Sequence, residues 1–565
     1  MNTKSTDFDC RRRVTSPVHV GNLTIGGDQQ VVLQSMTSTS TMDTEASVAQ
    51  CMRIARAGAQ MVRFTAQGVR EANNLANIRS ALRAKGVDVP LVADIHFNPR
   101  AAFAAAETVE KVRINPGNFV DPGRTFRKLE YTDQEYAAEL QKIDDALTPF
   151  LELCRERGTA IRIGVNHGSL SDRIMSRYGD TPAGMTESAM EFLRVCVKRR
   201  FTDVVISVKA SNVCVMVETV RRLVRAMDQE NMHFPLHLGV TEAGDGEDGR
   251  IKSCVGIGTL MAEGIGDTIR VSLSEEPECE LPVALMLRDY IEQLQQAPHI
   301  PGHKSLAVDY IMPQRRRSRA VVSIGGANDP VVVGSEPAAD YAADRRPDLF
   351  AGDFQYQQFD AAVPVEQWGE ISPGSVIVLT STHANRPGSM QAALHRMLQL
   401  GIDNPVIVRV DYGDLPVEEV TVRASVDFGT LLMNGFRDGI WIESRSMSHG
   451  EISSLAFGIL QAARLRVTRT EYISCPGCGR TLFNLQHTLA AVKAATASLR
   501  GLKIGVMGCI VNGPGEMADA DYGYVGAGVG HISLYRGKEC VEKNIPEDEA
   551  VEHLVNLIKA DGKWK

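Results

Sequence analysis

The sequence predicts an α/β protein with three parts: an N-terminal TIM (β/α)8 barrel, an inserted α/β middle domain and a C-terminal α+β domain. Three observations support this. Eight strand-length apolar runs lie between residues 31 and 273, mostly separated by helical patterns. The alternation resumes over 321–466, and three cysteines gather near the C-terminus. A chain of 565 residues has room for two to four domains, and we expect boundaries at 1–295, 296–466 and 467–565.

Composition excludes several classes of protein. Hydrophobic residues make up 44% and charged residues 23%, as in ordinary globular proteins. The net charge of −8 argues against a nucleic-acid partner. The apolar runs are too short to span a membrane, and the N-terminus has no apolar signal core or convincing transit peptide. Eleven cysteines, scattered and odd in number, predict a cytoplasmic protein.

The barrel prediction depends on the order of the apolar runs. Helical patterns such as "EASVAQCMRIARAGA" separate most of them, as parallel β/α units require. A doubly wound open sheet is the alternative, but the first run ends in "QSMTS" rather than in a glycine-rich turn. The runs occupy residues 31–36, 60–66, 89–96, 110–115, 159–166, 203–211, 235–244 and 267–274.

Polar residues stand at or near the carboxyl ends of these runs, which is the catalytic face of a TIM barrel. Four arginines and a lysine there predict a cationic pocket, and two acids are too few to neutralise it. A phosphate or diphosphate substrate would supply the missing negative charge. The alternative places the arginines outside the barrel, paired with helix acids. The candidates are Arg63, Asp94, His96, Arg113, Asn115, Arg162, Asn166, Lys209, Ser211, His237, Glu242, Arg270 and Ser272.

Three of these candidates have competing interpretations. His96 and His237 could be core or supporting residues instead of catalytic ones. Glu242, in the loop "TEAGDGEDG", is a candidate general acid or base, or else a surface acid.

The middle of the chain predicts a second α/β region after a linker over 296–320. Strand patterns are expected at 320–326, 375–381, 405–413, 428–436 and 438–444, with helices in "PGSMQAALHRMLQLG" and "EISSLAFGILQAARL". The charges at these strand ends (Arg409, Asp411, Glu443) are isolated. We therefore interpret 296–466 as a structural spacer, perhaps a degenerate barrel.

Cys475, Cys478, Cys509 and Glu516 predict one metal centre. A helical pattern over 482–499 and a strand, "LKIGVMG", separate the two cysteine motifs, and the turn "NGPG" can bring Glu516 back toward Cys509. Three thiolates suit an iron–sulfur cluster or zinc. A carboxylate as the fourth ligand is exchangeable, which could open one iron to a substrate oxygen. A structural zinc knuckle is the alternative, but such sites use Cys and His.

Long motifs give the chain a close resemblance to a known family. "VPLVADIHFN", "IRIGVNHGSL", "CPGCGR" and "MGCIVNGPGE" resemble those of the 4-hydroxy-3-methylbut-2-enyl diphosphate synthases. The likeness spans about 15–295 and 467–530. The long loop over 118–158 and the extra 300–466 region resemble the family's long form.

The resemblance implies an activity in the methylerythritol phosphate route to isoprenoids. The family opens 2-C-methyl-D-erythritol 2,4-cyclodiphosphate and removes a hydroxyl as water, with two electrons from a [4Fe–4S] cluster. It implies that Cys475, Cys478, Cys509 and Glu516 hold the cluster, with Asn512 beside it, and that Asp94, His96 and Glu242 line the pocket. The implied substrate contacts are Arg63, Arg113, Asn115, Arg162, Asn166, Lys209, Ser211, Arg270 and Ser272.

The partners implied are a cyclic diphosphate substrate and an external electron donor, ferredoxin or flavodoxin, because the chain has no flavin or nicotinamide fingerprint. We expect a homodimer, although the inserted domain could let one chain close on its own barrel. Two other functions compete. One is a phosphosugar lyase or aldolase with a structural zinc knuckle, in which Lys209 could form a Schiff base. The other is a non-enzymatic iron or redox sensor.

Overall fold

A computed structural model describes residues 8–121, 130–305, 308–510, 513–517 and 519–564. The chain divides into two compact units. One comprises 14–249, 266–285 and 470–565, and the other comprises 1–13, 250–265 and 286–469. The predicted domain bounds 1–295, 296–466 and 467–565 stay a prediction. In the described part of the chain, none of the helices has the length and apolar character needed to cross a membrane.

The first unit contains the predicted TIM barrel, which the structure confirms. Eight parallel strands follow the order β8-β7-β6-β5-β4-β3-β10-β9. A parallel bridge between Ile206 and Leu236 joins β8 to the start of β9 and nearly closes the ring. The strands are β3 (Val32–Met36), β4 (Met61–Thr65), β5 (Leu91–Asp94), β6 (Lys111–Ile114), β7 (Ala160–Asn166), β8 (Val204–Lys209), β9 (His237–Leu238) and β10 (Thr268–Ile269).

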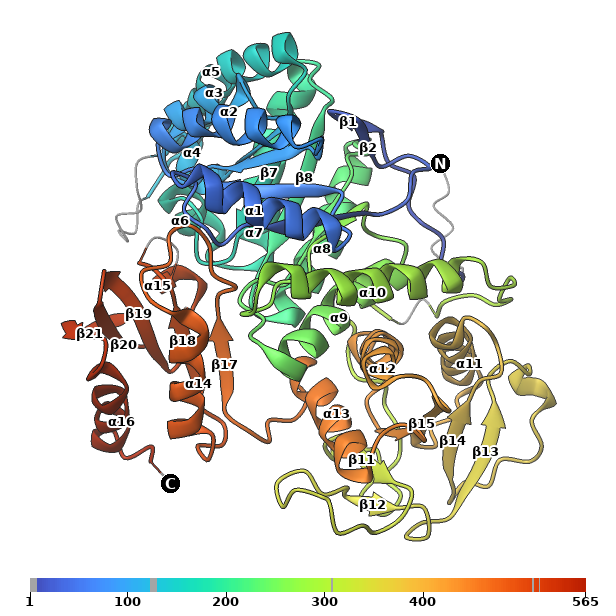
Figure 1. Ribbon diagram of the computed structural model, residues 1–565. Helices are drawn as coiled ribbons and strands as arrows, with labels where there is room; N and C mark the ends of the chain where they lie inside the picture. Colours follow the sequence, from blue (N-terminus) through green and yellow to red (C-terminus); the bar gives the residue numbers. More distant parts are fainter. Residues whose placement is uncertain (1–7, 122–129, 306–307, 511–512, 518, 565) are drawn as a thin grey trace. The chain divides into compact units, whose positions relative to one another are not determined.

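Helices connect the barrel strands, and their ends follow from local sequence (Figure 1). Helix α5 begins at a capping box in which Thr132 and Glu135 satisfy each other's backbone N–H groups, and it ends at Gly158 with φ 66°. The helices are α1 (Thr44–Arg56), α2 (Val69–Ala84), α3 (Pro99–Ala106), α4 (Pro116–Phe119), α5 (Asp133–Arg157), α6 (Asp172–Tyr178), α7 (Pro182–Lys198), α8 (Val213–Gln229), α9 (Gly246–Ala262), η1 (Pro277–Cys279) and α10 (Glu280–Gln295).

A hairpin covers the amino ends of the barrel strands. Strands β1 (Val18–Val20) and β2 (Leu23–Ile25) pair antiparallel, and Val18, Val20 and Ile25 are fully buried. They pack in one apolar cluster with Met61 of β4 and with residues at other strand starts. The hairpin therefore forms an apolar floor to the barrel, opposite the face where the predicted site residues stand.

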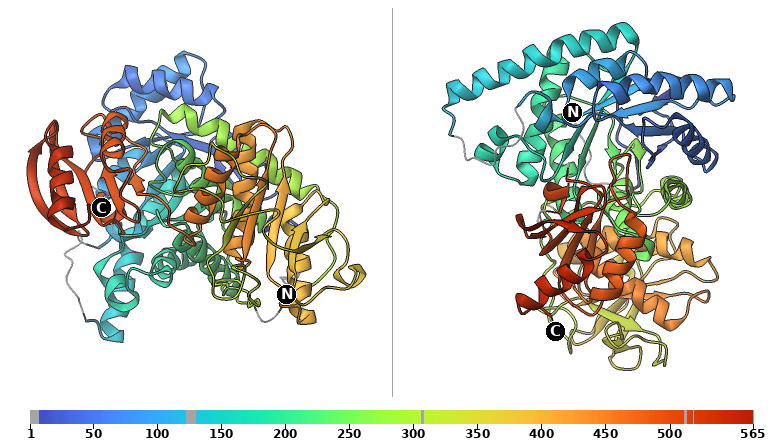
Figure 2. Two further views of the ribbon diagram at one scale, coloured as in Figure 1. Left: turned by 90° about the horizontal axis from the view of Figure 1, so that it is seen from below. Right: turned by 60° about the vertical axis from the view of Figure 1, so that its left-hand side comes forward.

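The C-terminal part of this unit, drawn in orange to red in Figures 1 and 2, is a mixed sheet with flanking helices. Strands β17 (Glu471–Ser474), β18 (Lys503–Met507) and β19 (Tyr522–Gly528) are parallel, and β20 (His531–Arg536) and β21 (Glu539–Pro546) continue antiparallel. Helices α14 (Leu485–Thr496) and α16 (Ala550–Ala560) contribute to its apolar core, and α15 (Gly513–Glu516) is one short turn. The predicted α+β fold is confirmed.

The second unit contains a six-stranded parallel sheet in the order β12-β11-β16-β15-β14-β13. This is the cyclic strand order of a (β/α) barrel that is left open between β12 and β13. The strands are β11 (Val331–Gly334), β12 (Leu349–Phe350), β13 (Tyr356–Asp360), β14 (Val376–Thr380), β15 (Val406–Asp411) and β16 (Gly439–Glu443), and the helices are η2 (Val365–Gln367), α11 (Arg386–Leu400), α12 (Val417–Met433) and α13 (His449–Ala462).

Two strand predictions in this unit are wrong. Most of 428–436 belongs to α12, which is buried on nearly all sides, so its apolar run shows no helical periodicity. Residues 320–326 form only an isolated bridge between Val321 and Ile324, and the first strand is β11. Short apolar runs do not distinguish a strand from a loop that packs on the core.

Candidate active site

One cavity at the carboxyl ends of the barrel strands brings most of the predicted site together. Its wall combines residues of the barrel with residues of both cysteine motifs. The predicted residues that line it are Arg63, Asp94, His96, Arg113, Arg162, Asn166, Lys209, Glu242, Arg270, Ser272, Cys475, Cys478, Cys509 and Glu516.

Three predicted residues lie outside the lining of this cavity. Asn115 caps α4 and donates from Nδ2 to Oγ of Ser169, 2.9 Å away. Ser211 stands close by, with Oγ 3.4 Å from the backbone oxygen of Glu516. His237 is fully buried in β9, where Nδ1 lies 3.3 Å from Oγ1 of Thr268. Asn512 lies outside the described residues.

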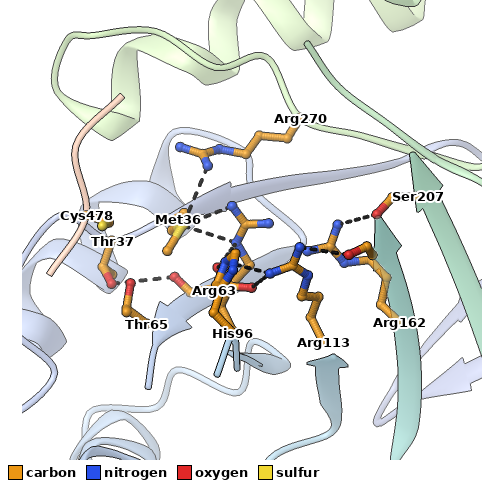
Figure 3. Close-up of polar contacts among 12 residues, drawn as sticks. Met36, Thr37, Arg63, Thr65, His96, Arg113, Arg162, Ser207, Arg270 and Cys478 are labelled. Carbon is orange, nitrogen blue, oxygen red and sulfur yellow. Dashed lines mark hydrogen bonds and ion pairs between the residues drawn. The ribbon is translucent and has the colours of Figure 1, made fainter. Parts of the chain in front are cut away.

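Arg113 is held in place within this cavity, which we call the mouth of the barrel (Figure 3). Its Nη1 lies 3.2 Å from Oδ1 of Asp94, and its Nη2 donates to the carbonyl of Gly164 at 2.8 Å and to Oδ1 of Asn166 at 3.0 Å. A Cβ on Gly164 would lie only 2.5 Å from Nε of Arg113. Glycine at that point of β7 therefore leaves the space that the guanidinium occupies.

The other arginines also line this cavity, so the alternative that placed them outside the barrel is wrong. Arg63 and Arg162 are 8% and 1% exposed. Arg63 lies against Sδ of Met36 at 3.0 Å, and Arg162 donates to Oγ of Ser207 at 2.8 Å (Figure 3). Arg270 forms a two-point contact with the buried carboxylate of Glu280, at 2.8 and 3.0 Å.

The carboxylates near the cavity neutralise only part of its positive charge. Burial lowers the pKa of Lys209 well below its usual value, and the charges of Arg63, Arg162 and Arg270 lower it further. Burial alone would raise the pKa of Asp94, but the nearby arginines outweigh it and hold that pKa well below its usual range. Burial, with the charge of Arg113, lowers the pKa of His96 to about 3, so this ring is neutral at pH 7. The mouth is thus prepared for an anion.

Glu242 faces the second carboxylate of the site. Burial, and then the negative charge of Glu516, raise the pKa of Glu242 well above its ordinary value. Its Oε2 has no hydrogen-bond partner among the described residues, and its backbone adopts φ 50°, which is unusual for a residue other than glycine. Glu242 is therefore a carboxyl group that can hold a proton at neutral pH and is directed at the cavity.

Glu516 is tied to the barrel. Its Oε1 accepts a hydrogen bond from Nδ2 of Asn166 at 2.7 Å. Beside it, two glycines meet backbone to backbone: a Cβ on Gly168 would lie 2.1 Å from the carbonyl oxygen of Gly515. Close approach of the "GPGE" turn (Gly513–Glu516) to the loop after β7 therefore requires these glycines.

The cysteine motifs are anchored by backbone contacts. The carbonyl of Cys475 accepts from Oγ of Ser274 at 2.9 Å, and its Sγ lies 3.3 Å from the amide nitrogen of Gly508. Sγ of Cys478 lies 3.4 Å from Nε of Arg480. N–H groups directed at sulfur stabilise thiolate ligands and lower the electron density on them.

Three cysteines and one glutamate are the candidate ligands of a metal centre. Among the described residues, no group of three His, Cys, Asp or Glu side chains is arranged to hold a metal ion. Cys475, Cys478, Cys509 and Glu516 instead stand around one cavity wall. A cubane cluster binds each ligand at a different iron, so its ligands surround a volume instead of a point.

Some members of the site were not predicted from the sequence. Arg480, Met36, Thr241, Thr481 and Met507 also line the cavity. Arg480 could have been found, because it stands within "CPGCGR" directly after the cysteine pair. The supporting carboxylate of Glu280 gave no signal, since it lies at the start of α10 in an ordinary helical pattern.

Comparisons with known proteins give one consistent result. Residues 15–285 match the family description "GcpE TIM-barrel domain", and residues 471–560 match "GcpE protein C-terminal domain". A relative from Bacteroides fragilis is 55% identical, with 99% of this chain and 97% of the relative covered. One from Protochlamydia amoebophila is 40% identical over 98% and 97%, and one from Chlorobaculum tepidum is 39% identical over 99% and 90%. All three are named 4-hydroxy-3-methylbut-2-en-1-yl diphosphate synthase (flavodoxin).

Proposed function

We propose a reaction for this chain from the family to which it belongs, since the chain is a member of the GcpE family. It converts 2-C-methyl-D-erythritol 2,4-cyclodiphosphate to 4-hydroxy-3-methylbut-2-enyl diphosphate as an iron–sulfur oxidoreductase of isoprenoid biosynthesis. The observation that carries the proposal is a single cavity whose wall joins the cationic barrel mouth to Cys475, Cys478, Cys509 and Glu516.

The cofactor of the proposed enzyme is a [4Fe–4S] cluster held by these three cysteines and Glu516. When bound, it would pass electrons from the external carrier to the substrate and provide a Lewis-acidic iron. Arg480, against Cys478, adds positive charge beside the ligand sulfurs. Asn166 orients the Glu516 carboxylate through the 2.7 Å hydrogen bond, so the barrel helps to set the position of the exchangeable ligand.

The substrate's diphosphate is held by the cations of the barrel mouth. Arg113 presents a guanidinium fixed by Asp94 and Asn166, and Arg270 presents one fixed by Glu280. Guanidinium groups held in a fixed orientation suit phosphate oxygens. Because they are oriented before the ligand binds, less entropy is lost on association. Lys209 and Ser272 add donors from the same wall. Asn115, Ser211 and His237 support this layer from positions outside the lining.

Glu242 is the proposed proton donor to the leaving hydroxyl. The overall change uses two electrons and one proton: the ring C–O bond breaks, a hydroxyl leaves as water, and the freed diphosphate oxygen carries one more negative charge. Burial and the charge of Glu516 raise the pKa of Glu242, which favours the protonated carboxyl that a general acid requires. Asp94 and the neutral His96 position Arg113 and line the pocket. A position of Asn512 beside the cluster stays a prediction.

Electrons come from an external carrier in this proposal, and the relatives' names favour flavodoxin over ferredoxin. Residues of one chain line the cavity, which supports an active site formed within a single subunit. A homodimer and a cytoplasmic location stay predictions, as does a spacer role for 296–466.

The test is anaerobic purification followed by iron, sulfide and turnover measurements. We expect about four irons per chain and reductive product formation with reduced flavodoxin. A Glu242→Gln protein should retain the iron and lose turnover. Zinc in place of iron, without turnover, would overturn the proposal in favour of the lyase or aldolase, and Lys209 would then be tested as a Schiff-base residue.

A further inference from the structure

A second polar layer lies beneath the substrate cavity, inside the barrel. Lys111 stands at the start of β6 and is 0% exposed. It shares the inner face of that strand with Arg113, two residues further on, about 7 Å along the strand. Its Nζ lies 2.9 Å from Sδ of Met61, a weak acceptor. Met61 belongs to the apolar cluster of the barrel floor, so Lys111 sits directly above that floor.

Other polar atoms in this layer have no partner. Both side-chain amide atoms of Gln34 and Nε2 of His237 are buried without a hydrogen-bond partner among the described residues. Both residues belong to barrel strands and are less than 2% exposed. Unpaired buried polar atoms are costly, so they indicate water or a donor that is present in another state of the enzyme. A protonated lysine offers three donors, and Gln34 Oε1 and His237 Nε2 are acceptors.

The charge balance of the cavity can change the protonation of side chains in this layer. The described cavity lining holds five arginines, Arg63, Arg113, Arg162, Arg270 and Arg480, but only three carboxyl groups, those of Asp94, Glu242 and Glu516, and burial favours the neutral form of Glu242 by raising its pKa. Arginine stays protonated in proteins, so excess charge can be relieved only at lysine or histidine. Lys111 is the buried lysine of this layer, and the groups acting on it are Arg63 and Arg162. His237 is also affected by the charge of Lys111 and Lys209.

We propose that Lys111 is a buried proton-binding site of the substrate cavity, neutral in the empty enzyme and protonated when a diphosphate occupies the mouth. The inference rests on the proposed diphosphate substrate and extends it. The negative ligand offsets the arginines that keep Lys111 neutral, and the new ammonium donates toward Gln34 and His237, directly or through water. Burial and the charge of Arg162 lower the pKa of Lys111 in the empty enzyme, in agreement with this state.

In the proposed reaction, the proton on Lys111 would stabilise the charge of the product. Ring opening leaves the bound diphosphate with one more negative charge than the substrate brought. A counter-charge beneath the arginine layer stabilises that product charge, while Glu242 supplies the separate proton that leaves in water. Lys111 lies outside the described cavity lining, so its role is electrostatic and it needs no contact with the substrate.

Proton uptake on binding tests the inference directly. Oxidised, cluster-loaded enzyme would be titrated calorimetrically at pH 8 with inorganic pyrophosphate and with the cyclic diphosphate, in buffers of different ionisation enthalpy. Without a reductant there is no turnover. We expect wild type to take up protons with both ligands, and Lys111→Met to take up about one fewer per site and to bind roughly tenfold more weakly. Lys142→Met, at an exposed lysine paired with Glu139, is the control and should match wild type.

The outcomes separate the two proposals. Equal uptake by wild type and Lys111→Met would overturn the role of Lys111, even if the cyclic diphosphate is turned over normally. Uptake that depends on Lys111 with pyrophosphate, without binding of the cyclic diphosphate, would overturn the proposed substrate alone. If Lys111→Met does not fold, Lys111→Arg replaces it: a guanidinium is already charged, so uptake should fall by about one proton, and unchanged uptake would again overturn the inference.

Discussion

Nδ2 of Asn166, at the tip of barrel strand β7, donates a 2.7 Å hydrogen bond to Oε1 of Glu516, which is 350 residues away in the chain. Asn166 also accepts from Nη2 of Arg113 through its Oδ1 at 3.0 Å. One amide therefore connects Arg113, a proposed substrate contact, to Glu516, the proposed cluster ligand, so a change at Asn166 should disturb both.

Asn166→Ala should lower kcat/KM by roughly ten- to a hundredfold, because the half-buried carboxylate of Glu516 loses a donor and Arg113 loses an acceptor. Steady-state kinetics with an artificial reductant would measure this. Asn166→Asp places a second negative charge beside Glu516 and should be worse than alanine. Wild-type kinetics in both variants would exclude a functional connection through this amide.

Gly164→Ala should weaken substrate binding, because the new Cβ would lie 2.5 Å from Nε of Arg113 and displace the guanidinium. We expect at least a tenfold rise in KM with iron content unchanged. Gly352→Ala is the matched control, since nothing lies within 4 Å of an added Cβ there. A normal KM in Gly164→Ala would mean that Arg113 does not need its observed position.

Gly168→Ala should block the approach of the "GPGE" turn (Gly513–Glu516) to the barrel. An added Cβ would meet the carbonyl oxygen of Gly515 at 2.1 Å, and φ at this position is +77°. Turnover should fall by about a hundredfold, while iron content remains as in wild type. Gly86→Ala is the control for backbone strain: it has φ +74° and nothing within 4 Å of the added Cβ. Equal loss in both variants would assign the effect to strain.

His395 should make the second unit sensitive to acid. This ring is 1% exposed, and burial, with the charge of Lys304, lowers its pKa from 6.5 to about 4. The unfolded chain binds a proton near pH 6.5 and the folded chain only near 4, so the free energy of unfolding falls as the pH drops through this window.

The expected loss is up to about 3 kcal/mol between pH 6.5 and 4, since one pKa unit corresponds to about 1.4 kcal/mol. His395→Gln retains an acceptor for the backbone N–H of Ser305 and should flatten this slope in urea unfolding experiments. His303→Gln, at an exposed histidine, should keep the wild-type slope. Parallel slopes for wild type and His395→Gln would refute the assignment.

Much of the barrel and its site could be predicted from the sequence. Apolar runs with charges at their carboxyl ends place Arg63, Arg113, Arg162 and Arg270 on one face, because parallel strands share an edge. The structure places all four in one cavity. His237 marks the limit of this reasoning. His237 begins β9, so its side chain lies in the layer below the cavity. The sequence alone does not show where along the barrel axis a strand residue lies.

Other features could not be predicted because they depend on distant partners. Glu280 is an ordinary first-turn helix residue until the fold places it against Arg270 and Ser35. The apolar segment of α12 is buried on nearly all sides, which removes the periodicity that identifies a helix. Pairing across the chain and uniform burial leave no local signature.

The apolar hairpin under the barrel has a kinetic consequence. With the floor sealed by Val18, Val20 and Ile25, the mouth is where substrate enters and where both products leave. The turn that holds Glu516 lines this mouth and is tied to the barrel by the Asn166 hydrogen bond and by the close approach of Gly515 to Gly168. Substrate arrival and product departure therefore share one opening, and a molecule that occupies it blocks both.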